Sequence, residues 1–62
     1  MNAELYSYTV TTKIGAIGLM TWGLQHDHDF ANHIFKQVQE KFTEADTVEI
    51  IKEVAYRLTG KA

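Results

Sequence analysis

The stretch IGAIGLMTWGL, residues 14–24, is the longest apolar run in the chain, and its interpretation decides the predicted fold. It is too short for a membrane span, which needs about 20 apolar residues. Residues 16–23 alternate between two sides, as the residues of a β-strand do. Residues 4–12, rich in Tyr and Thr, alternate in the same way, and the link at 13–15 ends in glycine. These features predict an N-terminal β-hairpin.

The length of the hairpin loop determines which faces of the two strands match. A two-residue loop places Tyr8 and Val10 on the same core face as Ile17. A three-residue loop would put Tyr8 and Val10 with Met20 and Trp22 instead. We favour the two-residue loop, because it gathers β-branched and aliphatic side chains on one face. Met20 and Trp22 then lie on the outer face, where we expect them to contact a partner.

After the hairpin the pattern becomes helical, and a first amphipathic helix is predicted over about residues 27–42. A carboxylate at its start, Asp27 or Asp29, can accept the free backbone N–H groups of the first turn. The expected apolar stripe of this helix consists of Phe30, Ala31, Ile34, Phe35, Val38 and Phe42.

A second amphipathic helix is predicted over about residues 47–59, and Gly60 suits its C-terminal end. Asp46 and Glu49 have the spacing of a capping box. No glycine or proline enforces a turn between the two helices, so one long bent helix is an alternative. The expected apolar stripe consists of Val48, Ile51, Val54, Ala55 and Leu58, with Ile50 beside it.

The predicted fold is therefore α+β, a single small domain over residues 1–62 with a β-hairpin at about 4–23 and two helices, in the order ββαα. A chain of 62 residues buries a small core, and it has no cysteine for disulfides. A lone two-stranded hairpin is marginal in water, and two helices cover only part of its apolar surface. We therefore expect oligomerisation to complete the fold.

The segment LQHDHDFANH, residues 24–33, contains all three histidines of the chain. His26, Asp29 and His33 could supply two imidazoles and one carboxylate to a divalent metal, with His28 nearby. The alternative, which we favour, is that this segment is only the solvated start of a helix. We therefore predict no cofactor, with a divalent metal as the alternative.

Composition limits the function to a few classes. The net charge is −2 and the six basic residues are scattered, which makes nucleic acid an unfavoured partner. The N-terminus MNAELYSYT does not resemble a signal peptide, and we expect a cytoplasmic protein without a membrane partner. A chain of this size has little room for a walled active site, so we predict no enzymatic activity.

The leading hypothesis is a small, non-enzymatic homo-oligomer that binds another protein, or a small ligand between subunits. Its predicted interface residues are Met20, Trp22 and Tyr56, the last on the polar face of the second helix. Two alternatives are kept: a metal-binding protein or sensor that uses the histidine segment, and a nucleic-acid-binding regulator built on a β-hairpin dimer.

Overall fold

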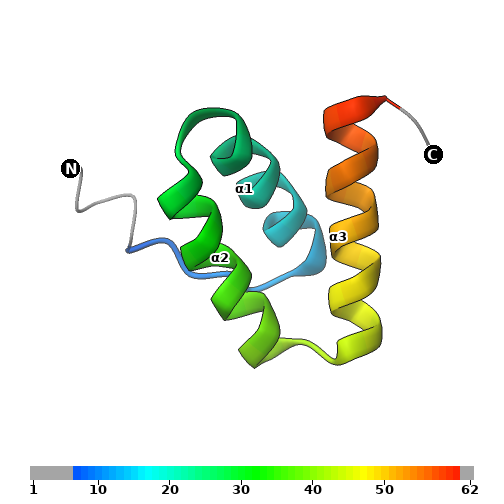
Figure 1. The fold of residues 1–62 in the computed structure, drawn as a ribbon. Helices are drawn as coiled ribbons and strands as arrows, with labels where there is room; N and C mark the ends of the chain where they lie inside the picture. Colours follow the sequence, from blue (N-terminus) through cyan, green and yellow to red (C-terminus); the bar gives the residue numbers. More distant parts are fainter. Residues whose placement is uncertain (1–6, 61–62) are drawn as a thin grey trace.

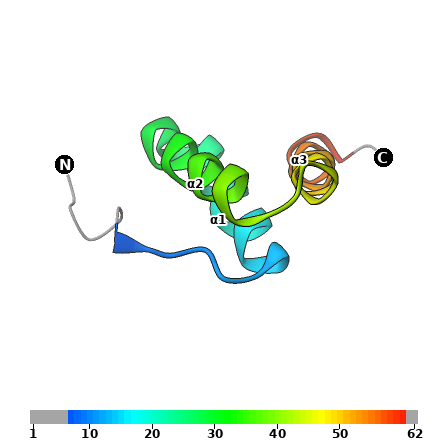
Figure 2. The ribbon, with the colours of Figure 1, turned by 90° about the horizontal axis from the view of Figure 1, so that it is seen from below.

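A computed structural model describes residues 7–60, which form three helices. These are α1 (Lys13–His26), α2 (His28–Lys41) and α3 (Glu44–Thr59). Helices α1 and α2 run antiparallel as a pair (Figure 1). Helix α3 packs mainly against α1 and barely touches α2, so it stands apart from α2 when the molecule is seen from below (Figure 2). None of the helices in the described residues is long and apolar enough to cross a membrane.

The α1 region contains the main correction to the sequence prediction. We predicted a β-hairpin over about residues 4–23 and an α+β fold, but residues 7–60 contain no strand and the fold is all-α. Only the start of the predicted hairpin, residues 4–6, lies outside the described residues. Thr12 begins a helix instead, because its hydroxyl accepts a hydrogen bond from the Gly15 N–H at 2.9 Å. The hairpin regulator thereby loses its structural basis.

The buried residues of α1 have the spacing of one helix face, although residues 16–23 also alternate as a strand would. The buried residues are Ala16, Ile17, Met20 and Gly23. A strand would place Met20 and Trp22 on one face, whereas a helix separates positions i and i+2 by about 200°. Met20 is therefore buried in the core with 6% exposure, and Trp22 is 40% exposed. The expectation of an outward Met20 was wrong, while Trp22 faces outward as expected.

Asp27 is the whole link between α1 and α2. Its N–H donates to the Gly23 carbonyl at 2.7 Å, which closes α1, and its carboxylate accepts the Phe30 N–H at 3.3 Å, which caps α2. Of the two capping candidates, Asp27 is thus confirmed. The apolar stripe of α2 is confirmed as well, since four of its members are buried and two partly buried: Phe30, Ala31, Ile34, Val38, Phe35 and Phe42.

Helix α3 begins three residues earlier than predicted. Thr43 caps it by accepting the Asp46 N–H at 3.1 Å, so the proposed Asp46–Glu49 capping box is wrong. Phe42 and Thr43 are both extended, and the alternative of one long bent helix is therefore wrong too. Gly60 ends α3 in the left-handed conformation, with φ at 72°, as the sequence indicated.

The buried line of α3 differs from the predicted stripe. Only Ile50 and Val54 are buried, and they are the contribution of α3 to the core. Most of the predicted stripe is exposed, namely Val48, Ile51, Ala55 and Leu58. We call these four residues the α3 stripe. Helix α3 thus packs on the core with only one side of its apolar surface, and the α3 stripe beside it is left exposed.

Lys13 ties the start of α1 to the first half of α3. Its Nζ lies 3.3 Å from Asp46 Oδ1 and 3.5 Å from Glu49 Oε2. The hydrogen bond to Asp46 and the negative charges of both carboxylates raise the pKa of Lys13 above its ordinary value of 10.5. All three side chains are substantially exposed, so this contact orients the helices more than it stabilises the fold.

Candidate functional site

The candidate site is an apolar hollow of about 430 Å³ where the N-terminal segment, α1 and α2 meet. We call it the aromatic pocket; it is lined by Tyr8, Leu19, Trp22 and Phe30. Phe30 is 1% exposed, whereas Tyr8 is 53% and Trp22 is 40% exposed. Tyr8, which we expected on a core face, therefore lies at the surface.

In the aromatic pocket, two exposed rings each meet the buried ring of Phe30 nearly at a right angle. Tyr8 meets Phe30 at a centroid distance of 6.1 Å and an interplanar angle of 77°. Trp22 meets Phe30 at 5.6 Å and 85°. Both contacts are edge-to-face, which is one of the geometries that aromatic pairs prefer. Two exposed rings standing across one buried ring offer apolar surface to an inserted group.

Gln37 holds the N-terminal side of this pocket in place with its whole amide group. Its Oε1 accepts the Val10 N–H at 2.8 Å, and its Nε2 donates to the Tyr8 carbonyl at 3.0 Å. The same Nε2 lies 3.1 Å from His33 Nε2, which must accept because the amide nitrogen only donates. Lys41 adds a bond to the Val10 carbonyl at 2.9 Å. The segment that carries Tyr8 is thus fixed along α2.

Replacing Gln37 tests this attachment. We expect Gln37→Leu to lower the free energy of unfolding by about 1–3 kcal/mol, because the Val10 N–H and the Tyr8 carbonyl lose their partner. Thermal unfolding followed by circular dichroism would measure the change. Gln39→Leu, at an exposed position of the same helix, is the matched control and should change little. Equal melting temperatures for the two variants would contradict the attachment.

The three histidines have separate contacts. The ring of His26 lies 5.0 Å from that of Trp22. His28 Nε2 lies 3.0 Å from the Leu24 carbonyl, at the C-terminal end of α1. His33 contacts Gln37 on α2, as described above.

Asp29 lies in the first turn of α2, where a carboxylate suits the helix dipole. No group of three or more His, Asp or Glu side chains within residues 7–60 is arranged to hold a metal ion. The structure therefore does not bring His26, Asp29 and His33 together as a ligand set. It places the segment at the junction of two helices.

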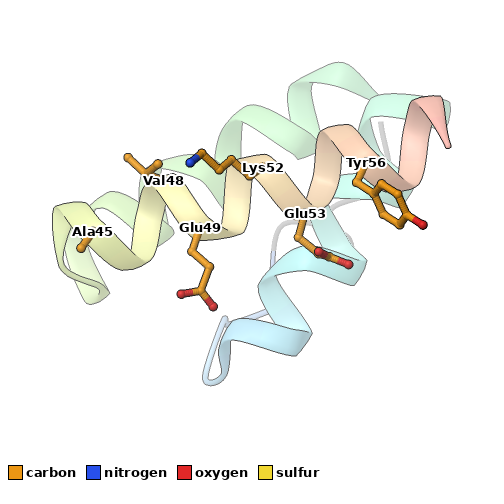
Figure 3. Close-up of a pocket in the computed structure, with 6 residues that line it drawn as sticks. All are labelled: Ala45, Val48, Glu49, Lys52, Glu53 and Tyr56. Atoms are coloured by element: carbon orange, nitrogen blue, oxygen red, sulfur yellow. The ribbon is translucent and has the colours of Figure 1, made fainter. Parts of the chain in front are cut away.

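A second hollow, of about 610 Å³, lies on the outer face of α3. All its lining residues come from this one helix, as Figure 3 shows: Ala45, Val48, Glu49, Lys52, Glu53 and Tyr56. Tyr56 is 45% exposed there, in agreement with its expected position on the polar face. A hollow on a single helix has no opposing wall, so it is a weaker candidate than the aromatic pocket.

Sequence reasoning found Trp22 but missed the other parts of the aromatic pocket. The i, i+3 spacing of Leu19 and Trp22 is a helical signal, but the strand interpretation placed these residues on opposite faces. The contacts of Gln37 span 27 and 29 residues of sequence, and no local pattern reports them.

Comparison with known proteins adds no homologue: no protein-family model matches the chain, and neither a curated protein nor a solved structure does.

Proposed function

We propose that this chain is a non-enzymatic binding protein that acts in the cytoplasm as a homo-oligomer. In this proposal the aromatic pocket receives an apolar side chain of a partner protein. The observation that carries the proposal is the arrangement of Tyr8 and Trp22, both exposed, across the buried ring of Phe30. Tyr and Trp, together with Arg, are enriched among the residues that dominate binding energy.

Two features support binding at this place. The aromatic pocket is lined from three parts of the chain, so an inserted group would be contacted from several sides. Its N-terminal side is fixed by the Gln37 amide, so binding would lose little conformational entropy there. Within residues 7–60 no carboxylate lines the aromatic pocket, which favours an uncharged apolar group over a cation.

A titration with p-cresol, which has the shape of a tyrosine side chain, tests the proposal. Trp22 is the only tryptophan, so its indole N–H gives a single NMR signal that reports on the pocket. We expect a saturable shift of this signal with a dissociation constant in the low millimolar range, because so small a ligand makes few contacts.

Two tyrosine variants provide the comparison. Tyr8→Ala removes one side of the pocket and should weaken p-cresol binding about 2- to 13-fold, since an aromatic contact contributes roughly 0.5–1.5 kcal/mol. Tyr56→Ala removes a similarly exposed tyrosine from α3 and should leave binding unchanged. If the Trp22 signal does not saturate, or if both variants bind like the wild type, the aromatic pocket is not the binding site.

A further inference from the structure

We infer that the α3 stripe is the surface on which two copies of this chain associate, with the two α3 helices antiparallel about a two-fold axis. This inference rests on the oligomeric part of the proposed function and adds its surface and symmetry. It concerns a different face of the molecule from the aromatic pocket.

The first argument is the uncovered apolar surface itself. Val48 is 46%, Ile51 41% and Leu58 39% exposed, and they lie on one side of one helix. The adjacent positions Ile50 and Val54 are buried against the rest of the core, so the apolar arc continues from the core to the surface. Helix α3 barely contacts α2, so α2 does not cover this side. Contiguous exposed apolar patches of this kind mark interaction sites.

The spacing of the α3 stripe makes it self-complementary. Its positions 48, 51, 55 and 58 are separated by three, four and three residues, so the pattern is the same when read from either end. An antiparallel two-fold axis therefore places the stripe on itself. Val48 of one copy then lies opposite Leu58 of the other. Ile51 lies opposite the small Ala55, where a large side chain can fit into a gap, as in the packing of coiled coils.

Charge favours the antiparallel over the parallel arrangement. The first turn of α3 carries Glu44 and Asp46, and its last turn carries Arg57. Asp46 pairs with Lys13 and Arg57 with Glu53, so these two groups do not face the α3 stripe of a second copy. Glu44 lies on the side of the α3 stripe by helical phase, and in a parallel pair the two Glu44 carboxylates would face each other and repel. In an antiparallel pair they lie at opposite ends of the interface, and the helix dipoles oppose each other favourably.

The mass of the wild-type protein as a function of concentration is the first test. Native mass spectrometry and sedimentation from about 1 μM to about 1 mM should show a monomer–dimer equilibrium with a micromolar dissociation constant, because one short stripe per copy makes a small interface. A monomer throughout this range would overturn both the inference and the oligomeric part of the proposed function. Binding of p-cresol would then still test the aromatic pocket separately.

A matched pair of isoleucine variants locates the surface. Ile51→Glu places a charge in the centre of the α3 stripe and should weaken dimerisation at least about 100-fold, because the carboxylate would be buried without a partner. Ile14→Glu changes an exposed isoleucine of α1, 78% exposed, and should leave dimerisation unchanged. Circular dichroism should show both variants folded. An unweakened Ile51→Glu dimer would overturn the surface and leave the oligomeric proposal standing.

Disulfide formation tests the orientation, since the natural chain has no cysteine. We would mix Val48→Cys and Leu58→Cys chains and oxidise them. The antiparallel arrangement predicts mixed disulfides between the two variants, which mass spectrometry separates from disulfides within each variant. A parallel pair would instead join each variant to itself, and that outcome would overturn the proposed symmetry.

Discussion

Gly23→Ala is expected to destabilise the fold strongly, although alanine is the better helix former. A Cβ atom at position 23 would lie 2.9 Å from the Cα, Cβ and N atoms of Ala31. Two of these are backbone atoms of α2, so no side-chain rotation can relieve the contact. Overpacking of this kind costs about 1–3 kcal/mol. In a domain of this size we expect the melting temperature to fall by about 10–15 °C.

Gly18→Ala is the matched control on the same helix and should have the opposite effect. Nothing lies within 4 Å of a Cβ atom at this position, and Gly18 is exposed. Replacing glycine by alanine inside a helix then stabilises by about 0.5–1 kcal/mol. Thermal unfolding of both variants at low protein concentration gives the comparison. Similar melting temperatures for the two would show that α1 and α2 do not approach each other at Gly23.

These two glycines also show why the fold class was mispredicted. The prediction places Gly15 in a hairpin turn, and Gly18 and Gly23 in a strand because residues 16–23 alternate. In the structure Gly23 occupies a buried helix position, where its missing side chain lets α2 pack closely. Tertiary packing therefore overrides the local preference of glycine against helix interiors. The need for glycine at position 23 comes from its contact with Ala31 in the next helix, which the sequence of α1 alone does not reveal.

Helix α1 also lacks the polar face that would have identified it. Exposed positions include Ile14, Trp22 and Leu24, while Ile17 and Met20 are buried, so apolar residues surround the helix. A helical period is visible only when one face is polar. The 11-residue run therefore shows no helical period, and its alternation predicts a strand instead.

The caps and stripes that were predicted correctly depend on local chemistry. Asp27 and Gly60 act within a turn of their own helix ends, and the stripe of α2 has charged residues opposite it. The candidate site is different, because Tyr8, Trp22 and Phe30 come from three segments. Its composition could be predicted only in part, since the contacts depend on how the segments pack.

The adjacent isoleucines of α3 provide the sharpest test of which side of this helix faces the core. We expect Ile50→Ala to lower the free energy of unfolding by about 2–4 kcal/mol, because Ile50 is fully buried and its loss leaves a cavity. A domain of this size has a total stability of roughly 3–9 kcal/mol, so the variant should be largely unfolded at elevated temperature.

Ile51→Ala should cost less than about 1 kcal/mol in the monomer, because the side chain is 41% exposed and alanine favours the helix. Chemical denaturation at low protein concentration measures both variants. The sequence alone predicts the reverse order of these two costs, because it places Ile51 in the centre of the predicted stripe and Ile50 at its edge. At high concentration the association of the α3 stripes should make the Ile51→Ala cost larger, since a ligand of the folded state adds to stability. A cost that is large at every concentration would mean that Ile51, not Ile50, faces the core, and both the packing of α3 and its proposed pairing would be wrong.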